Sequence, residues 1–379
     1  MPANLSYWEK KNFFNADVII IGSGIVGLNA AITIKMLNPK ISISILERGF
    51  LPSGASTKNA GFACFGSISE LIEQEKLTGT DGIHDLIAKR WQGLLKLRNL
   101  LGDDKIGYQN LSGYELFRAH QQDLSNECVS KLSHFNTLIE DIVLQKGVYK
   151  VADQKIKSFG FGNVENLIEN KLEAQLDPGL MMKALLAKCL GLGVQIFNNC
   201  EAIQIQEEDL HINISTNQGL FQGKKVLLAN NAFVGKLLPN VAVTPGRGQV
   251  VVTKPIDGLK IKGTFHYDQG YYYFRNINGR VLLGGGRNLD FEGEKTIEFG
   301  TTAMVQNALK ILLETVILPE TSFEIEHQWS GIMAFGPQLA PIIEEIKPRI
   351  FTAVRCNGMG IAIGSHTGEA AGEMVVKSL

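Results

Sequence analysis

The chain contains few of the residues that stabilise secreted or zinc-binding domains. Only five cysteines occur among 379 residues, and they are Cys64, Cys128, Cys189, Cys200 and Cys356. Their number is odd and no CxxC pair accompanies them, which argues against a disulfide framework and against a structural zinc site. The seven histidines are dispersed, with no pair at ligand spacing. The sequence therefore predicts no metal.

Long apolar runs and an excess of one charge are also missing. The longest apolar runs, such as residues 18–21, fall far short of the roughly 18 residues that span a bilayer. Residues 4–15 are polar and charged, so they do not resemble a signal peptide. The 37 basic and 38 acidic residues leave a net charge of −1, which argues against nucleic-acid binding through a basic face. We expect a cytoplasmic protein with no integral membrane segment and no nucleic-acid partner.

Proline is scarce, whereas glycine is abundant. The chain has 11 prolines and 40 glycines. Much glycine with little proline favours tight turns and close backbone approach to a ligand over disorder.

A glycine-rich turn follows the first apolar run. Residues 16–21 are typical of a strand buried on both faces, and residues 28–37 are typical of a buried helix. Between them, Gly22, Gly24 and Gly27 form a GxGxxG pattern. In this context the first glycine permits the turn, the second lets the backbone approach a pyrophosphate, and the third allows close helix–strand packing. The helix N-terminus, at Ile25 and Val26, offers free N–H donors to phosphate.

An acidic residue completes this unit. A second apolar run, residues 41–46, ends at Glu47, 20 residues after Gly27. A carboxylate at this distance suits a ribose hydroxyl and disfavours a 2′-phosphate. The unit therefore predicts a site for FAD or NAD rather than NADP.

The segment after Glu47 carries a family resemblance. Residues 53–62 read SGASTKNAGF, and this segment resembles the D-amino-acid-oxidase family of FAD-dependent oxidoreductases, which includes glycine oxidase, sarcosine oxidase and gamma-glutamylputrescine oxidase. The resemblance implies that the coenzyme is FAD and that this part of the chain wraps it, through Arg48, Ser56, Thr57, Asn59, Ala60 and Gly61.

Further blocks extend the resemblance over nearly the whole chain. Residues 176–180 (LDPGL) look like the start of a family helix, and residues 244–250 look like the family's passage into its substrate domain. The other matched blocks imply FAD contacts at Ala202, Ala229, Asn230, Gly331, Gly358, Met359, Gly360 and Ile361. Asn230 stands where the family has glycine, and asparagine tolerates unusual backbone dihedrals.

The resemblance implies an α/β chain, α+β overall, with a discontinuous Rossmann-like FAD-binding domain. A substrate domain, built on a mixed or antiparallel sheet, is inserted into it. The expected FAD-binding segments are 1–81, 151–243 and 329–379, and the expected substrate segments are 82–150 and 244–328. The first inserted segment looks helical, and the second contains a hairpin around residues 276–279.

The substrate pocket is expected on the first strand of that hairpin. Alternation along a strand puts Tyr271, Tyr273 and Arg275 on one face. The resemblance adds Met333, which stands where glycine oxidase holds the substrate carboxylate with arginine. Cys356 replaces a second arginine of that type, and Arg355 beside it should face away. Sarcosine oxidase's covalent cysteine and its lysine correspond to about Ile332 and to Ala362, so we expect non-covalent FAD.

Two substrate classes remain open. Without the arginine pair the substrate is either an amine that lacks an α-carboxylate or an amino acid held by Arg275, Arg287 or Arg247. For Arg287, a salt bridge with Asp290 or Glu294 is the more ordinary expectation. His266 with Asp268 forms a candidate acid–base pair, although a loop contact is the better interpretation.

The leading hypothesis is an FAD-dependent oxidoreductase that oxidises a C–N bond of a small amine or amino acid by hydride transfer to flavin. Oxygen or an electron carrier would accept the electrons. One alternative is a flavin hydroxylase, which usually carries a Gly-Asp-Ala block that this chain lacks near its C-terminus. The other is a non-catalytic FAD-binding subunit, since the arginine and lysine positions are lost.

Overall fold

A buried parallel sheet forms around the first strand of the chain. The structure, a computed structural model, describes residues 5–379. β1 (Asn15–Ile21) is buried over its last four residues, as expected for a strand covered on both faces. It pairs in parallel with β2 (Ile43–Leu46) on one side and with β11 (Gly219–Leu228) on the other. Segments far apart in the sequence therefore share this sheet.

The first sheet has the strand order β17-β18-β11-β1-β2-β8, and β10 and β9 continue from β11. β18 lies parallel to β11, which brings a strand from the last part of the sequence beside those near its start. The strands not yet bounded are β8 (Gln195–Phe197), β9 (Ala202–Glu207), β10 (Ile212–Thr216), β17 (Ile342–Lys347) and β18 (Ile350–Val354).

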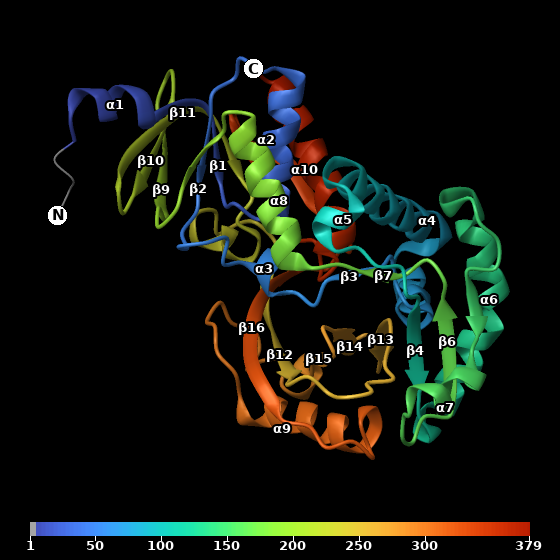
Figure 1. Cartoon of the computed structure of the whole chain (residues 1–379). Coiled ribbons are helices and arrows are strands. Elements are labelled where there is room, and N and C mark those ends of the chain that lie inside the picture. The colour runs from blue at the N-terminus through green and yellow to red at the C-terminus, as the bar shows by residue number, and fades with distance from the viewer. Residues whose placement is uncertain (1–4) are drawn as a thin grey trace.

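Helices from both ends of the chain pack beside this sheet (Figure 1). α10 (Gly360–Lys377) packs along α2 (Ile25–Leu37), and its other side contacts α4 (Ile68–Leu101). A Cβ on Gly368 would lie only 2.6 Å from the Val26 carbonyl oxygen. Glycine therefore lets α2 and α10 approach closely, and this contact ties the C-terminal segment to the helix that follows β1. α8 (Pro178–Gly191) packs against α2 as well.

A second sheet of eight strands lies below the first in Figure 1, in the order β16-β12-β15-β14-β13-β4-β6-β5. All of its pairs are antiparallel except β13 with β4, so the sheet is mixed. Its strands are β4 (Gly113–Phe117), β5 (Tyr149–Val151), β6 (Asn166–Asn170), β12 (Thr244–Thr253), β13 (Thr264–Tyr267), β14 (Tyr272–Ile277), β15 (Arg280–Gly285) and β16 (Ile325–Phe335).

The remaining elements are short or peripheral, apart from α6. They are α1 (Tyr7–Phe13), α3 (Ala55–Lys58), α5 (Asp103–Ile106), α6 (Gln122–Val143), α7 (Ile156–Phe159), α9 (Ala303–Leu312) and the paired strands β3 (Phe62–Ala63) and β7 (Ala174–Gln175). No helix within residues 5–379 combines the length and the apolar character needed to cross a bilayer.

The predicted fold class is confirmed, and the hairpin forms as expected between β14 and β15. The division of the chain into two domains stays a prediction, and sheet membership differs from it in places. Residues 82–150 are not only helical, because β4 lies within them and joins the second sheet. β6 also joins that sheet, although it lies in a segment assigned to the FAD-binding domain. β4 pairs with β6 about 50 residues away and with β13 about 150 residues away, so local pattern could not place β4 in this sheet. β6 pairs with β5 and joins the sheet through β4.

Candidate functional site

One cavity of about 650 Å³ is lined by residues from both the first and the second sheet. Its walls come from the glycine-rich turn after β1, the start of α2, the end of β2 and the start of α10. The opposite wall comes from β12, β13, β14 and β16 of the second sheet. Residues from both sheets and from both ends of the described chain therefore meet at this cavity.

The turn after β1 has the geometry that its glycines predict. Gly22 has a φ of +104°, which strains any other residue. A Cβ on Gly27 would lie 2.1 Å from the Gly22 carbonyl oxygen, so only glycine lets α2 pack this close to the turn. Gly24 is the N-cap of α2 and provides no side-chain cap. The first N–H groups of α2 thus lie at the cavity wall, where a helix N-terminus favours an anion.

Glu47 lies against this turn. Its carboxylate accepts hydrogen bonds from the Ser23 N–H (3.1 Å), the Ser23 hydroxyl (2.7 Å) and the Gly49 N–H (2.8 Å). The side chain is 8% exposed and lines the cavity. Three donors fix the carboxylate, and they leave acceptor sites that a ribose hydroxyl would use. The adjacent Arg48 also lines the cavity, and its guanidinium lies 4.1 Å from the centre of the Phe233 ring.

The segment around α3 closes over the start of α2. The Ser56 hydroxyl accepts a hydrogen bond from the Ile25 N–H at 3.0 Å. The Asn59 side chain bonds only to its own segment, donating to the carbonyls of Ala55 and Ser56 and accepting from the Gly61 N–H. The Thr57 hydroxyl donates to the Pro52 carbonyl at 2.6 Å. Ser56 is thus the residue of this segment that contacts the helix N-terminus directly.

The C-terminal turn presents a second helix N-terminus to the same cavity. Asn357 and Gly358 adopt φ values of +47° and +81°, and α10 begins directly after Met359 without a side-chain cap. Gly358, Met359, Gly360 and Ile361 all line the cavity. Such an end stabilises negative charge that develops on a bound ligand.

Most of the predicted FAD-contact residues line this one cavity. They are Gly22, Gly24, Ile25, Val26, Glu47, Arg48, Ser56, Asn59, Ala60, Gly61, Ala202, Ala229, Asn230, Gly331, Gly358, Met359, Gly360 and Ile361. Gly27 and Thr57 are not cavity residues, because one packs under the turn and the other bonds back to Pro52. Which atoms of FAD each residue contacts stays a prediction.

The unusual backbone predicted at Asn230 falls one residue later. Asn230 has ordinary φ and ψ values of −89° and 16°, whereas Asn231 has a φ of +50°. The Asn231 side chain accepts from the Arg355 N–H at 3.1 Å, which links this turn to the residue before Cys356. The expectation for Asn230 was therefore wrong in position, although asparagine does supply the left-handed residue.

Aromatic side chains and Met333 form the second-sheet wall. Tyr271, Tyr273 and Met333 line the cavity, together with Phe62 from β3. Tyr272 points to the other face, into the apolar core near α9. The alternation predicted along this strand is therefore present. Burial raises the pKa of Tyr273 to about 12, so its hydroxyl is neutral at physiological pH.

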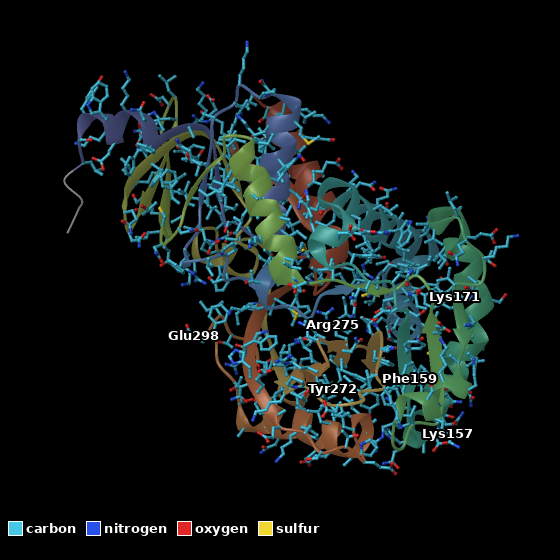
Figure 2. All side chains as sticks on the ribbon, in the orientation of Figure 1. Lys157, Phe159, Lys171, Tyr272, Arg275 and Glu298 are labelled. Carbon is cyan, nitrogen blue, oxygen red and sulfur yellow. The ribbon has the colours of Figure 1, made fainter. Side chains whose placement is uncertain are left out.

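Arg275 is not a cavity residue, although it shares the Tyr273 face. It is 2% exposed and lies nearer β3, whereas Tyr272 lies nearer α9 (Figure 2). A Cβ on Gly61 would lie 3.2 Å from an Arg275 guanidinium nitrogen, so the side chain packs behind the cavity wall. Burial lowers the pKa of Arg275 to about 10, and the nearby Asp177 partly offsets this.

Arg247 and Arg287 differ in what they contact. Arg247 pairs with buried Glu294 at 2.7 Å, so the salt bridge expected for Arg287 with Asp290 or Glu294 was wrong. Arg287 lines the cavity, and its guanidinium lies over Phe335 (4.2 Å) and Phe291 (4.9 Å). Of the three candidate arginines, Arg287 is the one that faces the cavity. Arg355 faces away as expected, because it donates to the carbonyls of Ala242 and Ala340.

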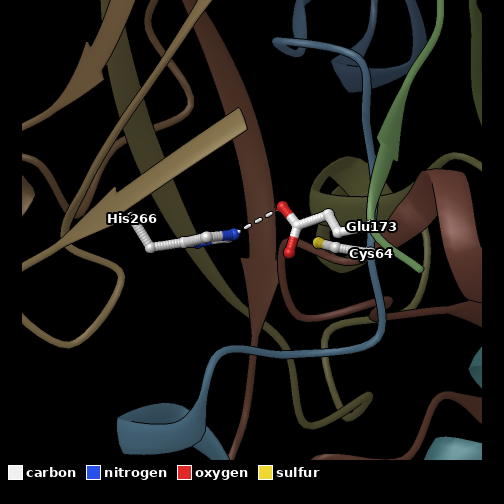
Figure 3. Close-up of side chains that lie close together, drawn as sticks. All are labelled: Cys64, Glu173 and His266. Carbon is white, nitrogen blue, oxygen red and sulfur yellow. Dashed lines mark hydrogen bonds and ion pairs between the residues drawn. The ribbon is translucent and has the colours of Figure 1, made fainter. Parts of the chain in front are cut away.

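Sequence reasoning missed a buried cluster of side chains beside β13, on the side of the cavity formed by the second sheet. His266 Nε2 lies 2.7 Å from a Glu173 carboxylate oxygen, and Cys64 lies beside them (Figure 3). His266 does not form the acid–base pair with Asp268 that the sequence offered as the less favoured interpretation, since Asp268 bonds to Gln121 and Asn288 instead. These three residues are about 90 to 200 positions apart, so no spacing pattern could have revealed the cluster.

A mixed fold in which two helix N-termini line one cavity is typical of dinucleotide-dependent proteins. The chain belongs to the family described as FAD dependent oxidoreductase (DAO), whose model matches residues 17–374. This confirms the resemblance stated on sequence grounds. The coenzyme of this family is FAD, and the chain is an oxidoreductase of this type.

Individual proteins show how far the similarity reaches. The chain is 23% identical to a "Probable oxidoreductase OrdL" from Haemophilus influenzae, over 96% of this chain and 83% of that protein. It is 20% identical to the glycine oxidase of Bacillus subtilis, over 95% and 93% of the two chains. The crystal structure of L-proline dehydrogenase from P. horikoshii superposes with a TM-score of 0.74 and 18% identity, covering 96% of this chain and 94% of that one. At such identity the structural match shows the fold alone.

The residues present fit FAD. A Cβ on Gly24 would lie 3.1 Å from the Ser56 hydroxyl oxygen, so glycine keeps this approach to the α2 N-terminus open. The buried carboxylate of Glu47 suits a ribose, and the uncapped start of α10 suits a group that gains negative charge.

Proposed function

We propose that this protein oxidises a C–N bond of a small amine or amino acid and holds FAD without a covalent bond. The observation that carries the proposal is the shared cavity: the N-termini of α2 and α10 line it together with an aromatic wall from the second sheet. FAD, when bound, would accept a hydride from the carbon of that bond.

The chain's own residues would bind and orient rather than react. The N–H groups at the start of α2 would hold the pyrophosphate, and Glu47 would accept from a ribose hydroxyl. The start of α10 would stabilise the negative charge that hydride transfer creates. Tyr271, Tyr273 and Met333 would exclude water from the reacting carbon, since all three line the cavity.

Two substrate classes are consistent with this pocket. Met333 offers no positive charge, which supports an amine that lacks an α-carboxylate. Arg287 supports an amino acid, because it faces the cavity with no ion-pair partner among residues 5–379. A guanidinium stacked on Phe335 keeps its donor fork at the ring edge, which suits a carboxylate.

The test is anaerobic mixing of the purified yellow protein with two matched panels. One panel holds small primary and secondary amines, and the other holds the corresponding α-amino acids. We expect members of one panel to bleach the flavin absorption near the visible maximum. Arg287→Met should raise the apparent Kd of a reactive amino acid about tenfold to a hundredfold, because a charged hydrogen bond is lost. It should leave a reactive amine unaffected.

The same preparation tests the coenzyme and the alternatives. Acid precipitation should release all of the flavin into the supernatant, and a yellow pellet would contradict non-covalent binding. The electron acceptor is identified by reoxidising the reduced flavin. Rapid reoxidation by air indicates oxygen, whereas reoxidation only by an artificial acceptor indicates an electron carrier. If NADPH alone bleaches the flavin, a hydroxylase is indicated, whereas photoreduction without bleaching by either panel indicates a non-catalytic FAD-binding subunit.

A further inference from the structure

The Cys64–His266–Glu173 cluster has no role in the function proposed above, and it is built from three distant segments. His266 lies on β13, Glu173 lies between β6 and β7, and Cys64 directly follows β3. All three side chains are buried, with exposed fractions of 6%, 1% and 4%. Cys64 and His266 line the cavity, whereas Glu173 does not. Figure 3 shows the three side chains close together.

Glu173 holds the His266 ring in one orientation. Its Oε1 lies 2.7 Å from His266 Nε2, and the same oxygen accepts from the Thr264 hydroxyl at 2.7 Å. The Phe62 ring meets the imidazole edge to face, with 5.3 Å between centroids. A buried carboxylate on one ring nitrogen fixes the imidazole and stabilises its charged form, which leaves the other nitrogen to act.

The other nitrogen of His266 has no hydrogen bond within residues 5–379. Nδ1 lies 3.9 Å from Glu70 Oε2, beyond hydrogen-bond distance. That Glu70 oxygen already accepts from the Ser67 N–H and hydroxyl. Glu70 also lines the cavity. His266 therefore carries one ring nitrogen bound to Glu173 and one without a partner in a cavity wall.

The distances favour a proton-holding pair over a metal site. The three potential ligand atoms lie within 4.8 Å of one another. However, zinc bonds of about 2.0–2.1 Å in a tetrahedron hold nitrogen and oxygen ligands roughly 3.3 Å apart, whereas Nε2 and Oε1 are separated by 2.7 Å. Burial also raises the pKa of Cys64 to about 11, which keeps the sulfur as a thiol.

We propose that His266, oriented by Glu173, is the group that takes the proton of the substrate's ammonium in the oxidation proposed above. The inference rests on that proposed function. In this step an N–H bond of the ammonium breaks, its electron pair stays on nitrogen, and an Nδ1–H bond forms. The neutral amine then gives up the hydride from carbon, and the bound proton later leaves to water. His266 is a catalytic residue in this scheme and Glu173 is a positioning residue.

The surroundings of His266 set the expected pH dependence. Burial alone lowers the pKa of His266, but the Glu173 charge, the neighbouring Cys64 and the hydrogen bond to Glu173 raise it well above 6.5. Glu70 faces the ring from α4, and Glu115 and Tyr273 flank it from β4 and β14. Burial raises the pKa of Glu115 as well. The imidazole becomes a proton acceptor only as pH rises through its own pKa.

The experiment is stopped-flow reduction of the holoenzyme by a reactive amine or amino acid from the panels, measured from pH 6 to 10. In the wild type the reduction rate should rise with pH. His266→Asn should lower it about 100-fold once the pH exceeds the pKa of His266, with little change in apparent Kd. The loss should shrink at high pH, where the free amine is already neutral. His327→Asn, at an exposed histidine on β16, is the matched control and should behave as wild type.

Glu173→Gln separates positioning from mere structural support. Loss of the carboxylate charge should move the pH profile to lower pH, because the imidazolium is less stabilised. An unshifted profile in this variant, or a wild-type rate in His266→Asn, would overturn the proposal while leaving the C–N oxidation intact. Stoichiometric zinc in the purified holoenzyme would overturn it in favour of a metal site. Failure of every panel compound to bleach the wild type would instead remove the proposed function itself.

Discussion

At the scale of single residues, the glycine-rich turn depends on the absence of one side-chain carbon. A Cβ on Gly27 would lie 2.1 Å from a backbone oxygen, which cannot move without displacing β1 or α2. Gly27→Ala should therefore destabilise the protein by about 1–3 kcal/mol or more. Denaturant unfolding followed by circular dichroism measures this change.

The matched control is Gly191→Ala at the end of α8. Nothing lies within 4 Å of a Cβ there, so alanine should be neutral or stabilising by up to about 1 kcal/mol. Equal stability of the two variants would contradict the close packing described for the turn.

The sequence placed residues that belong to a continuous local motif, but it could not place residues whose partners come from distant parts of the chain. Gly22 and Glu47 could be placed because the turn and the acid are read along one continuous strand–helix–strand unit. His266 could not be paired with Glu173, which lies 93 positions away, and the sequence offered only a loop contact or its neighbour Asp268. Arg247, on β12, forms the ion pair with Glu294 that was expected for Arg287, although Glu294 lies 47 positions away from it in the sequence.

At the scale of elements, α8 offers a clean test of helix capping. Asp177 accepts from the Leu180 N–H at 2.9 Å, and Pro178 is the first helical residue. Asp177→Ala should cost about 1 kcal/mol of unfolding free energy. Asp177→Asn should cost much less, because the amide oxygen can still cap. A loss as large in the asparagine variant, measured in the same denaturant series, would show that the charge facing Arg275 matters rather than the cap.

Elements whose partners are sequence neighbours were also the predictable ones. The β14–β15 hairpin follows from its turn, in which Asn278 and Gly279 both have positive φ, as a two-residue hairpin requires. The Asp-Pro start of α8 was equally clear. β4 and β6 were missed, because β4 reaches β13 across about 150 residues, and β6, although it pairs with the preceding short strand β5, joins the sheet only through β4.

At the scale of the whole molecule, FAD should bind the cavity that residues of both sheets line. A ligand that binds only the folded state stabilises it, by about 2.7 kcal/mol at a concentration 100 times its Kd. Removal of FAD should therefore lower the Tm, and adding FAD back should raise it in a concentration-dependent way. Differential scanning fluorimetry of apo- and holoprotein measures both. Coincident melting curves would contradict a coenzyme site shared by the two sheets.

The position of α10 has a consequence for synthesis. The cavity is lined both by the turn at Gly22 and by the start of α10 at Gly360. A nascent chain that still lacks α10 therefore has only part of the FAD-binding cavity. Coenzyme loading should then wait until α10 has been synthesised. Translation of an mRNA truncated before the α10 codons should give a protein that binds no FAD and is colourless. In a translation reaction with the full mRNA, the onset of bound-flavin absorption should mark the time at which α10 has folded.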